Sequence, residues 1–406
     1  MTVTQLQRID RWAGVPVCCA LTLVRSLFEK PAGPVDAPLR NLLFVKLAEQ
    51  GSTVLAYPAI REAIQMVGRE NVYFIVFDDN RFILDVMGVV PEENVITVSF
   101  ESFLGMATSA WRALWRLRRL KFDAAIDLEF FTRGSAALTF LTGARRRVGF
   151  HPFFGAGPYR GNLMTHRLLY NPHLHTAQMF HVMVQAVRRD PATLPTLDLL
   201  APSAQEPPPR FSPAAAEVES VQAMLRAELP DRSGLILLNP NASDLLPLRR
   251  WAGERYVQLA RKLLAEYRKA GLVFTGGPKE AGPVADLARQ VSDKRCVSLA
   301  GRTTLRQLLV LFTLADVLVT NDSGPAHFAT LTPIRVVTLF GPETPALYAA
   351  RSPRNVPLWA GVACSPCVNA YNNRQSPCRD NVCMQALTVD QVFAEVSRAL
   401  ERGQCE

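Results

Sequence analysis

The stretch VLVTNDSGPAH (317–327) places an acid, a hydroxyl and a glycine where an apolar, strand-like run gives way to a helical pattern that carries His327. A helix N-terminus presents unpaired N–H groups and a partial positive charge. With Ser323 and Gly324 beside it, such an end would suit a phosphate or diphosphate. Asp322 would repel phosphate, so we expect it to accept hydrogen bonds from sugar hydroxyls beside a diphosphate. On spacing alone the alternative, that Asp322 or Ser323 simply caps the helix, is favoured.

Other predicted strand ends carry small or basic residues. The segment LNPNASDLLPLRRW (238–251) contributes Asn239 and Arg249, and FTGGPKE (274–280) has two glycines before a helical pattern. LAGRTTLRQL (299–308) adds a loop in which we expect Thr303 to cap a helix. Several sheet ends of this kind are what a nucleotide-sugar site would need, and they shift the interpretation of Asp322 from a cap toward a binding residue.

The elements that would position these residues alternate between strand-like and helix-like patterns, which favours βαβ units and parallel sheets. Helical patterns occupy 53–67, 102–120 and 388–401, among others. Strands are expected at 41–46, 72–77, 94–98, 123–128, 234–240, 272–277, 296–299, 316–320 and 336–340.

A proline-rich segment, APSAQEPPPRFSP (201–213), interrupts this alternation and predicts a stiff domain linker. The expected fold class is therefore α/β with two doubly wound domains, whose ligands would bind beyond the carboxyl ends of the strands. The predicted division is a helical segment at 1–40, an acceptor-side domain at 41–200, the linker, a donor-binding domain at 214–387 and a C-terminal helix at 388–406.

Composition narrows the class of partner. The chain has 406 residues, 49% hydrophobic and 20% charged, so it is an ordinary globular protein rather than a disordered one. Its formal charge of +9 predicts anionic partners such as phosphates, acidic glycans, lipid head groups or nucleic acid. Eight cysteines in a chain of this length do not make a secreted disulfide scaffold.

Basic residues gather in the first half of the chain. Residues 130–189 contain eight arginines, among them Arg133, Arg145 and Arg147, and no Asp or Glu. Just before them, SAWRALWRLRRLK (109–121) predicts a basic amphipathic helix that bears tryptophan. We expect this region to face an anionic acceptor at a membrane surface, although a basic face can be mere solvation. Nucleic acid is the rival partner and is disfavoured, because no recognised binding module appears.

The apolar segment AGVPVCCALTLV (13–24) is too short to span a bilayer as a helix, and no cleavage site of the A-x-A type follows it. We expect it to lie in a membrane interface or to pack on the domain, and the sequence favours neither alternative.

Four cysteines near the C-terminus, Cys364, Cys367, Cys378 and Cys383, have the spacing C-x2-C-x10-C-x4-C. The first pair has good zinc spacing. We favour a structural loop over 364–383, with zinc or labile disulfides as the alternatives.

Taken in order, N-P-x-A…R-R-W, G-G-P-x-E, L-A-G-x-T-x-L, N-D-S-G-P-x-H and L-F-G-P resemble glycosyltransferase family 9, the ADP-heptose:lipopolysaccharide heptosyltransferases. The stretches at 42–61 and 121–150 are similar to the family's first domain. The resemblance covers roughly residues 40–400, and the N-D-S-G-P-x-H block is its most specific part.

The resemblance implies a GT-B fold and an inverting transfer of heptose from ADP-heptose to a lipopolysaccharide inner-core acceptor, without metal or cofactor. Asp322 would hold sugar hydroxyls, Ser323 and Gly324 the diphosphate, and Arg249 would face the phosphates. His327 is either a ligand contact or a packed, hydrogen-bonded side chain. The protein would then act in the cytoplasm, at the inner face of the cytoplasmic membrane.

The catalytic base departs from the family pattern. The family's first glycine turn normally reads Gly-Asp, whereas here Gly51 is followed by Ser52. A serine needs a base of its own, so Glu49 is the expected base. Pairing of Glu49 with Lys46 or an arginine is the alternative, and catalysis would then be lost or moved. A relative that uses another nucleotide sugar, or a silent sugar-nucleotide-binding protein, therefore remains an alternative function.

Overall fold

The computed structural model describes residues 3–28, 37–99, 101–153, 157–193, 195–196, 207–244 and 246–404. The chain divides into two compact units. Unit 1 comprises residues 1–208 together with 369–375, and unit 2 comprises 209–368 together with 376–406. The expected pair of α/β domains is therefore confirmed, with a short stretch of the C-terminal region packed into unit 1.

Unit 1 is built on a six-stranded parallel sheet of order β3-β2-β1-β4-β5-β6. Val45 at the end of β1 is in register with Asp127 at the end of β4, so the residues that follow these two strands meet at one sheet edge. The strands are β1 (Leu42–Val45), β2 (Val72–Phe77), β3 (Val95–Val98), β4 (Ala124–Asp127), β5 (Arg146–Phe150) and β6 (His166–Leu168).

Helices cover both faces of this sheet. Right-handed crossovers that run from β1 toward β3 put their helices on one face, and those from β3 to β4 and β4 to β5 put α6 and α7 on the other. The helices are α1 (Val3–Trp12), α2 (Gly14–Phe28), α3 (Gln50–Leu55), α4 (Tyr57–Val67), α5 (Asp78–Met87), α6 (Phe103–Leu120), α7 (Arg133–Leu141) and α8 (Thr176–Ala186).

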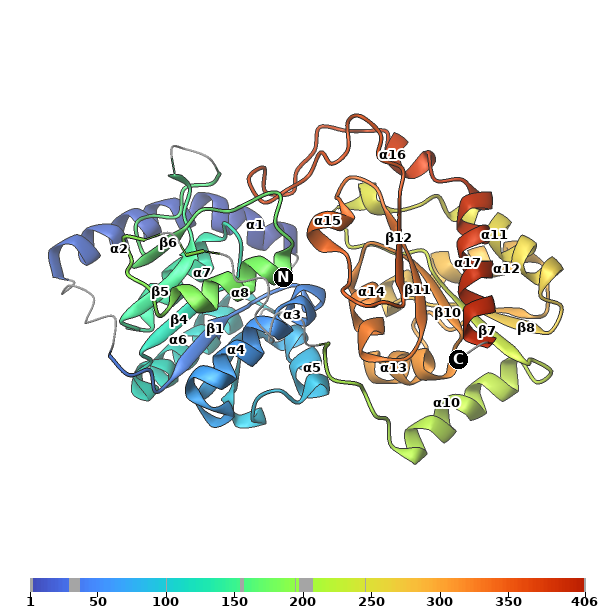
Figure 1. Ribbon diagram of the computed structural model, residues 1–406, viewed down its shortest axis with the longest axis horizontal. Helices are drawn as coiled ribbons and strands as arrows, with labels where there is room; N and C mark the ends of the chain where they lie inside the picture. Colours follow the sequence, from blue (N-terminus) through green and yellow to red (C-terminus); the bar gives the residue numbers. More distant parts are fainter. Residues whose placement is uncertain are drawn as a thin grey trace. The chain divides into compact units, whose positions relative to one another are not determined.

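The N-terminal helices α1 and α2 pack on α7 (Figure 1). This contact fits the alternative in which the apolar segment 13–24 packs on the domain. Asp10 of α1 pairs with Arg133 at 3.3 Å and accepts a hydrogen bond from the Gly134 N–H. Arg25 of α2 donates to the carbonyls of Asn162 and Met164. No single described helix is long and apolar enough to cross a membrane, although α1 and α2 together pass that test with a bend of 44°.

Unit 2 repeats the plan with a parallel sheet of order β12-β11-β10-β7-β8-β9. Its strands are β7 (Gly234–Asn239), β8 (Ala270–Phe274), β9 (Cys296–Ser298), β10 (Val317–Asn321), β11 (Arg335–Phe340) and β12 (Asn355–Trp359). Its helices are α10 (Ala215–Glu228), α11 (Gly253–Glu266), α12 (Ala281–Val291), α13 (Leu305–Leu314), α14 (Gly324–Phe328), α15 (Pro345–Tyr348), α16 (Val382–Gln385) and α17 (Val389–Gln404).

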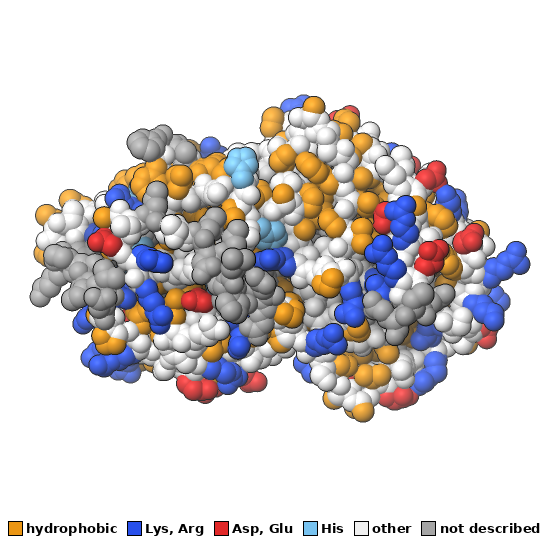
Figure 2. All heavy atoms as spheres, in the orientation of Figure 1, with side chains coloured by type: hydrophobic (Ala, Val, Ile, Leu, Met, Phe, Trp, Pro, Cys, Tyr) orange, Lys and Arg blue, Asp and Glu red, His pale blue; other side chains and the backbone are white. Residues whose placement is uncertain are grey.

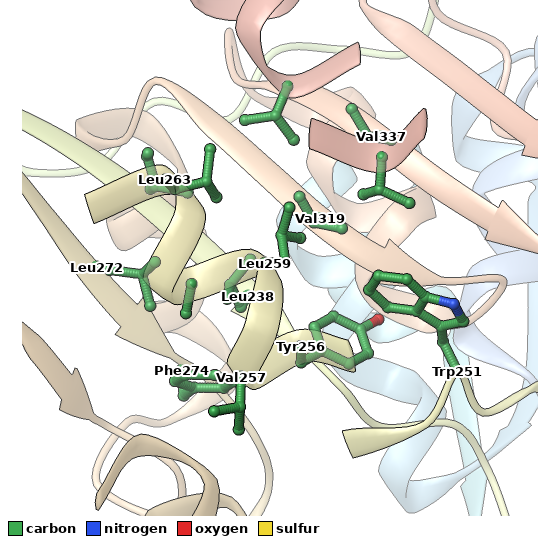
Figure 3. Close-up of a cluster of buried hydrophobic side chains, with 14 of the residues drawn as sticks. Leu238, Trp251, Tyr256, Val257, Leu259, Leu263, Leu272, Phe274, Val319 and Val337 are labelled. Carbon is green, nitrogen blue, oxygen red and sulfur yellow. The ribbon is translucent and has the colours of Figure 1, made fainter. Parts of the chain in front are cut away.

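The core of unit 2 fills the space between β7, β8, β10 and β11 on one side and α11 and α17 on the other. Figure 3 shows Trp251 and Tyr256 pointing toward each other at the end of this cluster. Their rings meet edge to face with centroids 5.0 Å apart. Burial of these large rings next to the strand ends gives the loop after β7 a fixed support.

Three strands were not predicted. β5 begins with two arginines, β6 has only three residues, and β12 contains a proline at the sheet edge, so none has the uniform apolar run of a central strand. The helix predicted at 53–67 is divided between α3 and α4. Pro58 lacks a backbone N–H and therefore lies in the first turn of the second helix, which begins at Tyr57. The helices predicted at 102–120 and 388–401 are confirmed as α6 and α17.

The domain boundaries also differ in detail from the prediction. Residues 3–28 belong to unit 1 rather than to a separate segment, and residues 369–375 leave the predicted donor domain for unit 1. Within the predicted linker, residues 201–206 lie outside the described residues. Phe211 donates its N–H to the Leu331 carbonyl at 2.7 Å, so the end of the linker already belongs to unit 2.

Candidate active site

Asn321 is the last residue of β10, and its side chain forms hydrogen bonds to the neighbouring loop. Its side-chain oxygen accepts from the Trp251 N–H and the Tyr256 hydroxyl, and its amide group donates to the carbonyls of Pro240 and Asn241. The loop after β7 and the loop after β10 are thereby locked together. Sequence analysis did not single out Asn321, although it stands in the same block as Asp322.

Arg249 lies between two acids at this sheet edge. It donates to the Asp322 carbonyl at 3.1 Å, and its Nη2 is 2.6 Å from Glu343 Oε2. The Arg249 Nε atom is 3.8 Å from Asp322 Oδ2. All three side chains are largely buried, with 14% of Arg249, 5% of Asp322 and 2% of Glu343 exposed. Such a cluster offers acceptors for sugar hydroxyls and a guanidinium that can face a diphosphate.

Glu343 was missed by sequence analysis. It follows β11 in the stretch LFGPET, from which only L-F-G-P was used, and its register beside β10 brings it to Arg249. The signal that could have found it is an acid directly after a buried parallel strand. Adjacent parallel strands end at the same sheet edge, so an acid directly after β11 lies near an acid directly after β10.

The remaining residues of the predicted diphosphate loop cluster around α14. Ser323 stands before this five-residue helix and donates to the Asn321 carbonyl at 3.1 Å instead of capping it. A Cβ atom at Gly324 would make only ordinary contact with Phe328, so packing does not demand glycine there. His327 is buried within α14. The ligand roles of these three residues stay predictions.

Of two residues predicted on the donor side, Asn239 bonds within the loop after β7, and Thr303 is not the cap that was expected. Asn239 ends β7, where its side chain donates to the Thr275 hydroxyl and accepts from the Asn241 N–H. It therefore shapes the loop, and a contact with donor stays a prediction. The N-cap of α13 is Thr304 rather than Thr303, because Gln307 three residues later completes a capping box with Thr304. Thr303 is half-buried in the preceding loop.

In unit 1 the candidate base Glu49 follows β1 and has a left-handed backbone, with φ of 67°. Its carboxylate forms an ion pair with Arg374 from the excursion 369–375, and 30% of the Glu49 side chain is exposed. Ser52 donates its hydroxyl to the Glu49 carbonyl at 2.9 Å. Glu49 therefore pairs with an arginine, as one alternative expected. Lys46, the other expected partner, pairs with Glu129 instead.

The excursion 369–375 is fixed to unit 1 by aromatic contacts. The Tyr371 hydroxyl donates to the Tyr170 carbonyl, and the Tyr371 ring stacks on Phe131 with centroids 5.5 Å apart. The Arg374 guanidinium lies 5.4 Å from the ring centroid of Phe130. Sequence analysis missed Arg374 because 325 residues separate it from Glu49, and no local pattern links them.

Buried ion pairs lie beneath this loop, after β1 and β4. Lys46 pairs with Glu129 at 3.0 Å, and the Ala48 N–H also donates to Glu129. Asp127 pairs with Arg160, and burial raises the pKa of Asp127 to about 6 although Arg160 opposes the shift. Paired charges that are almost fully buried are expected to hold the strand ends in one geometry.

The predicted acceptor-side arginines need a correction. Arg133 is buried against Asp10, and Arg147 is buried with bonds to the carbonyls of Leu163 and Ala144. These two side chains are used inside unit 1 rather than presented as surface cations. Arg145 is exposed. Part of the acid-free stretch therefore serves folding, because buried guanidinium groups satisfy backbone carbonyls.

The four C-terminal cysteines are free thiols and line one cavity of about 280 Å³ in unit 2. Within the described residues, no group of three or more His, Cys, Asp or Glu side chains is arranged to hold a metal ion. In the sequence, the cysteines flank the excursion 369–375 that carries Arg374. The structural loop predicted over 364–383 therefore contains the segment that belongs to unit 1.

Comparison with known proteins identifies relatives of one kind. The family model for glycosyltransferase family 9 (heptosyltransferase) matches residues 111–376. Lipooligosaccharide heptosyltransferase 2 of Campylobacter jejuni is 26% identical over 164 residues, which are 40% of this chain and 50% of the relative. For lipopolysaccharide heptosyltransferase 2 of Salmonella typhimurium the identity is 36% over 101 residues, 24% of this chain and 29% of the relative. The Escherichia coli K12 enzyme of the same name is 28% identical over 233 residues, 56% of this chain and 62% of its own. The chain thus spans less than two thirds of the length of each of these relatives.

Solved structures show the same fold. E. coli ADP-heptose lps heptosyltransferase II superposes with a TM-score of 0.66 at 19% identity, over 90% of this chain and 99% of that one. E. coli heptosyltransferase WaaC with ADP-2-deoxy-2-fluoro heptose gives a TM-score of 0.57 at 16% identity, over 88% and 99%. The expected GT-B fold class is therefore confirmed.

Proposed function

The chain belongs to glycosyltransferase family 9, and from this premise we propose that it transfers heptose from ADP-heptose to a lipopolysaccharide inner-core acceptor or a related surface glycan. The observation that carries the proposal is the buried cluster of Arg249, Asp322 and Glu343 at the carboxyl ends of β10 and β11. In this cluster, carboxylates that can accept hydrogen bonds from sugar hydroxyls lie beside a guanidinium, at the sheet edge where folds of this kind bind nucleotides.

In the proposed reaction the acceptor hydroxyl attacks the anomeric carbon of heptose, and the bond from that carbon to the diphosphate oxygen breaks with inversion. The hydroxyl proton passes to a carboxylate base, and ADP leaves. Arg249 supplies positive charge where negative charge grows on the leaving diphosphate, so the scheme requires no metal ion or other cofactor. Asp322 and Glu343 keep the guanidinium in place.

Glu49 is the proposed base, with Arg374 as the residue that positions it. Glu49 lies in the loop after β1, and its Oε2 atom is 3.4 Å from the Oγ atom of Ser52, which occupies the family's usual Asp position. For Glu49 to accept a proton, the bound acceptor must share or displace the Arg374 contact. The observation that favours a silent sugar-nucleotide-binding protein is this same ion pair, which occupies the only acid carried by this loop (46–52).

The partners of the proposed enzyme are a nucleotide-sugar donor and an anionic glycolipid acceptor. We also propose that the enzyme acts at the cytoplasmic side of the inner membrane. The basic character of the chain and the exposed faces of unit 1 described below support this location.

Donor identity is tested by calorimetric titration with ADP-heptose, ADP, a UDP-hexose and a GDP-hexose. We expect ADP-heptose to bind most tightly, with ADP retaining part of the affinity. Tighter binding of another nucleotide sugar would identify a different member of the family, and no binding of any nucleotide would overturn the donor site.

A further inference from the structure

Helix α6 has an outer face that no part of the described chain covers. Four of its large apolar side chains are exposed, with 63% of Phe103, 73% of Leu104, 71% of Trp111 and 54% of Trp115 accessible. Leu104, Trp111 and Trp115 are spaced seven and four residues apart, so they form one stripe along the helix. Ala113 and Leu117 on the opposite side enter the core. A stripe of this kind marks an interaction site on a soluble unit.

Basic side chains border this stripe. The helix contains no Asp or Glu, and its exposed cations are Arg112, Arg116, Arg118 and Arg119. The Arg119 guanidinium lies 3.2 Å from the ring centroid of Trp115, so charge and aromatic surface are presented together. The electrostatic complement of such a face is a negatively charged surface.

A second apolar face lies on the same side of the unit 1 sheet. Helix α2 packs on α7, and α7 covers the same sheet face as α6. On α2 the exposed fractions are 60% for Leu23, 66% for Leu27 and 78% for Phe28. Figure 2 shows hydrophobic side chains next to basic ones on the part of the surface formed by unit 1.

We propose that the outer faces of α6 and α2 form a docking surface for an anionic lipid bilayer. Tryptophan prefers the interface between head groups and acyl chains, and arginines near an anionic leaflet are attracted to it. A helix with an apolar stripe and a basic border binds parallel to such a surface. The docking surface would hold unit 1 where glycolipid acceptors are found, but it does not depend on the identity of the donor.

Flotation of the full chain with vesicles tests the proposal. The vesicles are phosphatidylcholine alone or phosphatidylcholine mixed with phosphatidylglycerol, at low and high salt. We expect binding to the anionic vesicles only, reduced by salt. Trp111→Ser with Trp115→Ser should weaken it at least about ten-fold. The matched control is Trp359→Ser, which removes an exposed tryptophan from unit 2.

A charge series provides the second arm. Reversal of Arg112, Arg118 and Arg119 to Glu should weaken binding by about five-fold or more for each residue at low salt. Arg116 is kept because its guanidinium bonds to the Glu93 carbonyl. The control reverses Lys269, Lys279 and Lys294, which are exposed in unit 2 and give the same change in net charge.

Thermal unfolding and titration with ADP verify that each variant is folded. Loss of vesicle binding in the α6 variants but not in the controls would support the docking surface. Three outcomes would overturn it: no binding of the parent chain to anionic vesicles, equal losses in the α6 and control series, or tighter binding to single-stranded RNA than to vesicles. None of them bears on donor binding, which is measured separately.

Discussion

Both units place acidic side chains at the carboxyl ends of parallel strands, but they hold these acids with different partners. In unit 2, Asp322 and Glu343 follow adjacent strands and share Arg249 from the loop after β7. In unit 1, Glu49 pairs with Arg374, which arrives from the far end of the chain. One sheet edge suffices to build the cluster of Arg249, Asp322 and Glu343, whereas the candidate base depends on a segment that the sheet does not position.

The largest effect is expected at the base in unit 1. Glu49→Gln should lower turnover by about 10²–10⁴-fold and leave donor affinity unchanged, because a general base contributes about that factor. Steady-state kinetics and donor titration measure the two quantities. Ser52→Ala is the control and should change turnover much less. Transfer by Glu49→Gln at the parental rate would show that Glu49 is not the base.

A smaller effect is expected at Asp322 in the Arg249 cluster of unit 2. Asp322→Ala should weaken ADP-heptose more than ADP, since each lost hydrogen bond to a charged group costs about 1.5–3 kcal/mol. Titration of both ligands on the parent and the variant gives the difference. Equal losses, or none, would mean that Asp322 only maintains the loop and does not contact the sugar.

These two predictions differ in how far sequence alone could reach. The strand-to-helix transition at N-D-S-G-P and nine of the twelve strands in the two sheets were predictable, because they depend on local patterns. Arg374 was not, since a contact across 325 residues needs the three-dimensional fold. Arg133 and Arg147 were placed on the surface for a similar reason, because composition cannot tell a buried arginine that satisfies carbonyls from an exposed cation.

Arg374 tests whether the excursion 369–375 matters for the reaction. Arg374→Gln removes the ion pair but leaves Tyr371 against Phe131. We expect turnover to fall by about ten-fold, with donor affinity unchanged and a shifted pH profile, because the carboxylate of Glu49 loses its orienting partner. Arg374→Lys should recover part of the rate. A fall in stability with unchanged turnover would make the pair purely structural.

The smallest effect concerns stability in unit 1. Burial and the nearby charges of Arg167 and Arg160 lower the pKa of His151 from 6.5 to about 4. Between these values the unfolded chain binds a proton that the folded chain does not, so the free energy of unfolding should fall as pH drops from about 6.5 to about 4. His151→Gln should reduce this fall, and the exposed His173→Gln should not. Urea unfolding across this pH range measures the slopes, and identical slopes for both variants would contradict the assignment.

Transfer of heptose tests the central claim most directly. The purified chain is incubated with ADP-heptose and lipopolysaccharide from heptose-deficient bacteria, and the glycolipid is analysed by mass spectrometry. We predict a mass increase of one heptose residue with the parent chain, accompanied by release of ADP, and loss of that product with Glu49→Gln. Tight binding of ADP-heptose without any transfer to such acceptors would contradict the transferase assignment and leave a sugar-nucleotide-binding protein.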